Sequence, residues 1–177
     1  MKHAKTLEKN DLRLLIHLIA MVCKNDFGSD KFHRNFVSLD NLKMLARVQS
    51  LDFISSSDIR ILIEGLCHLT ASKQQLSFGF TDKEETLLYC SSLNLIITTL
   101  LKDIEKLERS NKLRIDDFSK IIRAVSSAPI YKHLILLHSW KEFLIGNSER
   151  MGLQNITDIE VALENLDFKD PLLYHTL

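Results

Sequence analysis

The sequence predicts an all-α fold: a single-domain bundle of about six to seven helices around one long central helix, residues 81–110. Two observations favour this class. Apolar residues within 81–110 recur at alternating steps of three and four, which places them on one stripe of a helix. The 177 residues also include only 5 Gly and 2 Pro, whereas β-rich folds need many turn residues.

The long helix is predicted to begin at Thr81, because Thr81 and Glu84 have the spacing of a capping box. Leu95, Ile96 and Leu101 widen its apolar stripe, so the middle of the helix is expected to be covered on more than one side. The stripe itself consists of Cys90, Leu93, Ile97, Leu100, Ile104 and Leu107.

Helices are also predicted for residues 7–23, 39–49 and 55–69. The first is apolar on almost every side and should be buried. Ser55 and Asp58 loosely resemble a capping box at the start of the third. Its inward face is predicted to carry Ile59, Leu62, Ile63, Leu66 and Leu69. Residues 76–80 alternate between apolar and small, so they form either one short strand or an extended linker.

Three further helices are predicted after residue 110, at 116–127, 130–145 and 158–166. Asp116 and Asp117 suit the positive end of the first, and Thr157 with Glu160 resembles a capping box for the last. We expect one domain, residues 1–177, although a division into an N-terminal part, 1–80, and a C-terminal helical part, 81–177, is left open.

The charge, the cysteines and the length of the apolar segments limit which functions and cellular compartments are expected. Lys plus Arg and Asp plus Glu number 23 each, so the formal net charge is zero and no bulk attraction toward nucleic acid is expected. The 3 Cys are far apart and form no CxxC pair, which indicates a reducing, intracellular compartment, expected to be the cytoplasm. No segment reaches the ~20 apolar residues of a membrane-spanning helix, so no membrane association is expected.

The motifs that usually mark enzymes are absent from the sequence. It contains no nucleophile elbow, phosphate-binding loop or dinucleotide fingerprint. The 7 His include no HxxxH pair, and the spacing of His133 and His138 puts them on different faces of one helix. We therefore predict a protein that is not an enzyme, with no catalytic, metal-binding or cofactor-binding residues and no cofactor.

The predicted function is a non-enzymatic helical protein–protein interaction or regulatory module, acting as a subunit or adaptor in a complex with another protein or with itself. Aromatic residues are enriched at interface centres, and an apolar chain end is unusual. The predicted partner-binding residues are Trp140 and Phe143 in helix 130–145, and Leu172, Leu173 and Tyr174 in the tail. The sequence leaves open whether the tail binds a partner or covers its own core.

The alternative is a winged helix-turn-helix DNA-binding regulator, with residues 76–80 as the wing and helix 81–110 as a dimerisation arm. Its nucleic-acid contacts would come from Lys43, Arg47, Ser56, Arg60 and Lys73. The recognition helix would expose Asp58, Arg60, Glu64 and His68. This surface is nearly neutral, whereas a recognition helix is normally positive, so DNA binding is possible but not favoured.

Overall fold

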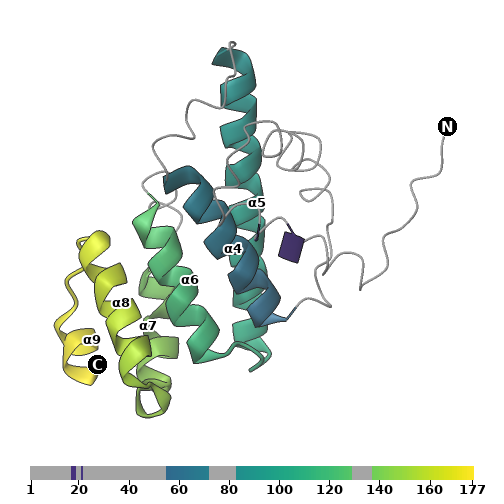
Figure 1. Ribbon diagram of the computed structural model, residues 1–177. Coiled ribbons are helices and arrows are strands. Elements are labelled where there is room, and N and C mark those ends of the chain that lie inside the picture. The colour runs from purple at the N-terminus through teal and green to yellow at the C-terminus, as the bar shows by residue number, and fades with distance from the viewer. Residues whose placement is uncertain (1–16, 19–20, 22–54, 72–82, 129–136) are drawn as a thin grey trace.

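The computed structural model describes residues 17–18, 21, 55–71, 83–128 and 137–177, drawn as coloured ribbon in Figure 1. Within these residues the secondary structure is helical and no strand occurs, so the predicted all-α class is confirmed. The elements are α4 (Ser56–Ala71), α5 (Lys83–Arg109), α6 (Ile115–Ser127), α7 (Leu137–Gly146), the 3₁₀ turn η3 (Ser148–Arg150), α8 (Leu153–Asn165) and α9 (Pro171–Thr176). The predictions for helix 39–49, for most of helix 7–23, for residues 76–80 and for the Thr81 cap lie outside the described residues.

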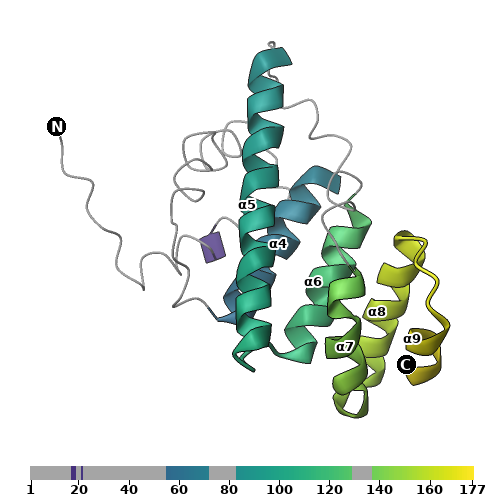
Figure 2. The same cartoon turned by 180° about the vertical axis from the view of Figure 1, so that it is seen from behind.

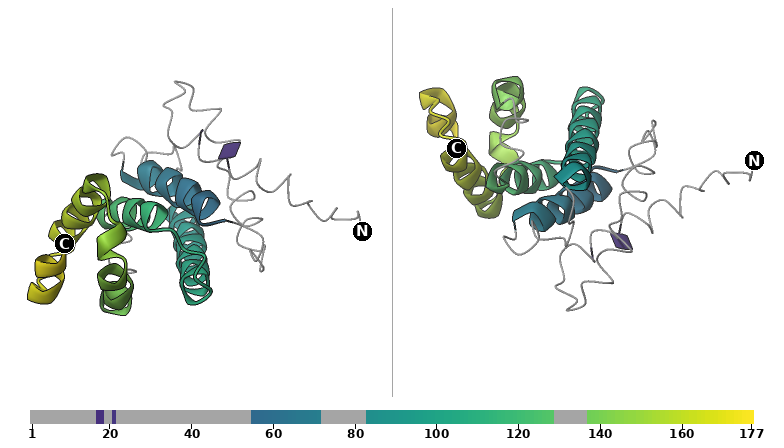
Figure 3. Two further views of the ribbon diagram at one scale, coloured as in Figure 1. Left: turned by 90° about the horizontal axis from the view of Figure 1, so that it is seen from below. Right: turned by 90° about the horizontal axis from the view of Figure 1, so that it is seen from above.

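Helices α4, α6 and α8 lie side by side, with α6 in the middle. Helix α4 also packs against α5, the longest described helix, and the short α9 lies beside α7 (Figures 1 and 2). Seen from below and from above, α5 and α9 lie on opposite sides of the described helices, with α6 and α8 between them (Figure 3). No described helix is long and apolar enough to cross a bilayer.

The apolar stripe predicted for the long helix is buried where its side chains are described. Ile97 and Ile104 are fully buried, and Leu107 packs partly buried against the same core. Leu95 is the exception: it is 56% exposed, so the prediction that it widens the buried stripe is wrong. Its position two residues before Ile97 turns it about 200° around the helix, toward solvent.

Helix α6 contributes the aromatic centre of the core. Phe118 is buried, and its ring centroid lies 4.8 Å from that of Trp140 and 5.1 Å from that of Phe143, both in α7. Tilted and edge-on ring pairs at these distances are favourable beyond their burial. The Cys67 thiol of α4 is buried in the same core. Burial first, and the nearby Glu64 carboxylate second, raise the pKa of Cys67 to about 12.

The ends of the helices follow local sequence chemistry. The Ser55–Asp58 capping box is confirmed, because Ser55 N donates to Asp58 Oδ2 at 3.1 Å and Asp58 N donates to Ser55 Oγ at 3.3 Å. The capping box predicted at Thr157 and Glu160 is wrong. Helix α8 begins earlier, where Gly152 N donates to Asn155 Oδ1 at 3.0 Å, and Thr157 Oγ1 bonds to Leu153 O within the helix.

The C-terminal tail forms a helix that the sequence analysis did not anticipate. The Asp170 carboxylate caps α9 by accepting hydrogen bonds from Leu172 N at 3.0 Å and Leu173 N at 3.2 Å. Pro171 occupies the first helical position, where its missing N–H costs nothing. The preceding helix α8 ends at Asn165, and two residues later Asp167 has a φ of 50°, which lets Phe168 N donate back to Leu163 O.

Candidate functional site

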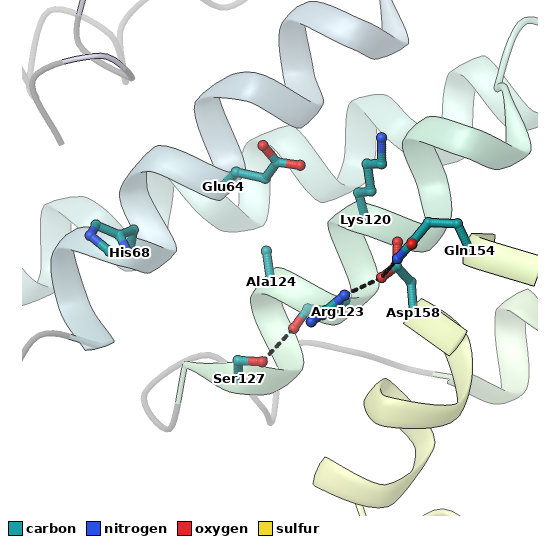
Figure 4. Close-up of a pocket in the computed structure, with 8 residues that line it drawn as sticks. All are labelled: Glu64, His68, Lys120, Arg123, Ala124, Ser127, Gln154 and Asp158. Carbon is teal, nitrogen blue, oxygen red and sulfur yellow. Dashed lines mark hydrogen bonds and ion pairs between the residues drawn. The ribbon is translucent and has the colours of Figure 1, made fainter. Parts of the chain in front are cut away.

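The described helices enclose an open groove, which we call the polar groove (Figure 4). Its volume is about 530 Å³, within the range of small-ligand sites. Helix α6 forms its floor, and α4 and α8 form its two walls. The lining residues are Glu64 and His68 from α4, Lys120, Arg123, Ala124 and Ser127 from α6, and Gln154 and Asp158 from α8.

Each helix contributes a short stripe at helical spacing. On α6, Lys120, Arg123 and Ser127 recur at steps of three and four, so they share the face that turns away from the buried Phe118 and Ile121. The wall residues come in pairs four apart, 64 with 68 and 154 with 158. The groove therefore forms where mostly polar faces of α4, α6 and α8 lie next to one another.

The Arg123 guanidinium is held in the groove by a buried acid. Its Nη1 forms a short ion pair with Asp158 Oδ1, and Gln154 Nε2 donates to the same oxygen at 3.0 Å (Figure 4). The Asp158 side chain is only 2% exposed, whereas Arg123 is 47% exposed. A half-exposed cation is thus anchored by a carboxylate that solvent scarcely reaches.

Lys120 is placed differently. No hydrogen bond or ion pair joins its ammonium group to any residue in the described part of the chain. The nearest acid along the α4 wall is Glu64, whose Oε1 lies 3.2 Å from Arg60 Nη1. The two groove acids therefore each contact an arginine, and Lys120 contacts neither of them.

Buried polar contacts clamp α4 onto α6. Ser56 Oγ donates to Asp117 Oδ2 at 2.7 Å, and Arg60 Nε lies 2.9 Å from Asp117 Oδ1. The second contact is close enough for an ion pair but lacks hydrogen-bond alignment. Arg114 Nε lies farther away, 3.9 Å from Asp117 Oδ2. Since the Asp117 side chain is 6% exposed, burying its charge is costly, and these partners offset part of that cost.

A matching set of contacts clamps α8 onto the other side of α6. The Asn155 amide donates to Asp116 Oδ1 at 3.1 Å and to Ser119 Oγ at 3.2 Å. Asp116 and Asp117 lie in the first turn of α6, as predicted, and they also hold the neighbouring helices. The walls of the groove are thus fixed to its floor by polar side chains as well as by the core.

Two of the residues predicted to contact nucleic acid, Ser56 and Arg60, lie in the described part of the chain. Ser56 is buried and Arg60 is partly buried, and both face Asp117 of α6. Asp58 is buried as well and Glu64 is partly covered, so of the four residues expected on the exposed face only His68 is exposed. Lys43, Arg47 and Lys73 lie outside the described residues.

The five predicted partner-binding residues divide into two groups. Trp140 and Leu173 are buried in the core of this chain, 7% and 1% exposed, and Phe143 is packed against Phe118. Leu172 is 57% exposed and Tyr174 is 43% exposed. The tail therefore covers its own core through Leu173, whereas Leu172 and Tyr174 point away from the core, and partner binding by the tail stays a prediction.

An ion pair ties the start of α9 to α7. Lys141 Nζ lies 2.6 Å from Asp170 Oδ2. The hydrogen bond from Lys141, helped by those from the Leu173 and Leu172 amides, holds the pKa of Asp170 below its usual value of 3.8. The lowered pKa favours the ionised form of Asp170, which is the form that pairs with Lys141.

The sequence analysis missed Lys120, Arg123, Gln154 and Asp158. In the sequence these residues show only that polar side chains recur at steps of three and four on helices that are otherwise apolar. That pattern normally marks a face exposed to solvent, so it does not predict a site. Among the described residues, no three of His, Cys, Asp and Glu are placed to hold a metal ion. Searches for similar protein families, curated proteins and solved structures found no match to this chain.

Proposed function

We propose that this chain is a non-enzymatic helical interaction module, a subunit or adaptor that binds another protein through Leu172 and Tyr174 of α9. The observation that carries the proposal is the construction of α9. A six-residue helix is held firmly to the body of the protein, yet it leaves two large apolar side chains in solvent.

Four contacts hold α9 in place. Leu173 is buried, Asp170 caps the helix, Lys141 pairs with Asp170, and Tyr174 Oη lies 3.4 Å from Phe168 O. A chain end is usually mobile unless it is tied down in this way. Side chains that are already ordered lose less entropy on binding, which favours a rigid apolar surface as a contact site.

The alternative of a DNA-binding regulator has less support. It needs basic side chains of the third predicted helix to reach phosphates, whereas Arg60 contacts Glu64 and Asp117 within the protein. Ser56 is likewise engaged with Asp117. Releasing them for DNA would leave Asp117 buried without its partners, at a cost that phosphate contacts would first have to offset.

The proposal is tested by placing a photo-crosslinking amino acid at position 172 and, as a matched control, at position 153. Leu153 is also an exposed leucine, 81% accessible, but it lies on α8. After irradiation in extracts of the source cells, adducts are identified by mass spectrometry. We expect a defined protein, or a second copy of this chain, to crosslink at 172 and not at 153.

A second variant, Tyr174→Ser in the protein crosslinked at 172, checks that the adduct depends on the same surface. The adduct yield should fall several-fold. Tyr174→Phe, which keeps the ring but removes the hydroxyl that contacts Phe168 O, controls for loosening of α9 and should keep the adduct. Equal adducts from positions 172 and 153, or none from position 172, would show that α9 is not a partner-binding surface.

A further inference from the structure

We propose that the polar groove between α4, α6 and α8 binds an anionic group, a carboxylate or a phosphate carried by a ligand. This site is separate from α9 and does not depend on the function proposed for that helix. Three features support it: hydrogen-bond donors of Arg123 and Lys120 that have no partner in the described residues, acids in the groove that are already paired, and walls held to the floor by polar contacts.

The floor of the groove offers unused hydrogen-bond donors. A guanidinium has five N–H bonds in a planar fork that suits carboxylate and phosphate oxygens. Within the described residues, only Nη1 of Arg123 has a hydrogen-bond partner among its side-chain nitrogens, namely Asp158. Lys120, one turn earlier on the same face, contributes an ammonium group that no described residue engages.

The groove is lined by two acids and two basic side chains, so its preference for an anion comes from which of these groups are already paired. Asp158 is nearly buried and already accepts from Arg123 and Gln154, and Glu64 contacts Arg60. Neither acid is left to attract a cation by itself. The Lys120 charge is not compensated by a contact, and the exposed His68 adds a further possible donor at the α4 wall.

One of the two cations, Arg123, is also held before a ligand arrives, and so are the walls of the groove. Asp158 anchors Arg123, while Asp117 and Asn155 join the α4 and α8 walls to α6. An anchored guanidinium loses less side-chain entropy on binding than a free surface arginine would. The geometry therefore separates this groove from an ordinary charged surface, where isolated ion pairs contribute little.

The experiment is a titration of the full chain, labelled with ¹⁵N, followed by amide chemical shifts. The two probes are inorganic phosphate and an N-acetylated, C-amidated tetraglutamate peptide, each added at constant ionic strength balanced with sodium chloride. We expect saturable shifts at residues 120–127 and 154–158 with at least one probe. The probe that binds more tightly distinguishes a phosphate ligand from a carboxylate ligand.

Three variants locate the binding. Lys120→Gln should weaken it about 2- to 5-fold, as expected for loss of one partly exposed charge contact. Glu64→Gln should strengthen it, because a negative charge leaves the α4 wall. Lys102→Gln, an exposed lysine on α5 outside the groove, should leave affinity unchanged. The amide spectrum of each variant without ligand verifies that it is folded.

Shifts that stay linear with both probes, or that are the same in Lys120→Gln as in the parent, would overturn the proposal. The two proposals can fail separately. A crosslink at position 172 without anion binding would support the proposal for α9 and overturn the proposal for the groove. Anion binding without a crosslink at position 172 would support the proposal for the groove and overturn the proposal for α9.

Discussion

At the scale of single residues, the informative side chains are the polar ones that lie between helices. Asp117 is 6% exposed, and its two carboxylate oxygens are shared between Ser56 and Arg60. A buried carboxylate without partners is costly, so the contribution of each partner shows when it is removed. Arg60 and Arg114 form a natural comparison, because both approach Asp117 but only Arg60 is close and mostly covered.

Replacing Arg60 with Ala should lower the free energy of unfolding by about 1–3 kcal/mol, because Asp117 keeps Ser56 but loses its nearest cation. Denaturant titration followed by circular dichroism measures the loss. Arg114→Ala, which removes a side chain that is 66% exposed, should cost less than about 0.5 kcal/mol. Equal losses in the two variants would show that the Arg60–Asp117 contact does not hold α4 to α6.

At the scale of helices, α9 shows how little sequence is needed to fix a short element in place. Asp170 caps it, Pro171 starts it and Leu173 inserts into the core. Six residues are too few for a helix to persist alone in water. The ion pair of Asp170 with Lys141 should therefore contribute to its anchoring, and the low pKa of Asp170 gives that contribution a definite pH dependence.

The sign of that dependence follows from linkage. The folded-state pKa of Asp170 is lowered, so its contribution is present above the usual value of 3.8 and is lost as pH falls through the folded-state pKa. Asp170→Asn keeps a capping residue but removes the charge. We expect Asp170→Asn to be less stable than the parent at pH 7, with a difference that shrinks as pH falls below 3.8.

Denaturant midpoints of both proteins at pH 7, 5 and 3 would test this expectation. Glu160→Gln, which removes an exposed acid on α8, is the matched control and should leave the midpoint nearly unchanged throughout. A difference between Asp170→Asn and the parent that is constant with pH would mean that the carboxylate charge does not anchor α9.

How far the sequence predicts the structure also becomes clear at the scale of helices. Periodicity gave α6 almost to the residue, because Phe118, Ile121, Ile122 and Val125 have an unambiguous spacing and two acids precede them. The predicted start of α8 is too late, because Thr157 has the residue type and spacing of a helix cap. The actual start is marked by the bond from Gly152 N to the Asn155 side chain, and neither residue is typical enough to predict it. Periodicity could not predict the groove, since spacing says nothing about which helices lie next to one another.

At the scale of the whole molecule, one apolar core joins α4 to α9. Ile63 and Leu66 of α4, Ile97 and Ile104 of α5, and Phe118 of α6 all belong to it. Leu173, in the C-terminal helix α9, belongs to the same core, so the tail is packed onto the body of the protein. A side chain removed anywhere along this core should therefore affect the cooperative unfolding of the whole described structure.

Helix α5 offers the sharpest test, because Ile97 and Leu95 lie two residues apart on the same helix and differ in exposure, fully buried against 56% exposed. Ile97→Ala should cost about 2–5 kcal/mol, combining lost burial with the cavity left behind. Leu95→Ala should cost less than about 0.5 kcal/mol, since it removes a side chain that is mostly in water. Thermal and denaturant unfolding measure both. Similar losses would mean that the buried face of α5 has been misassigned. A cost for Ile97→Ala that is at least about four times that of Leu95→Ala would place α5 within the same cooperative core as α4 and α6.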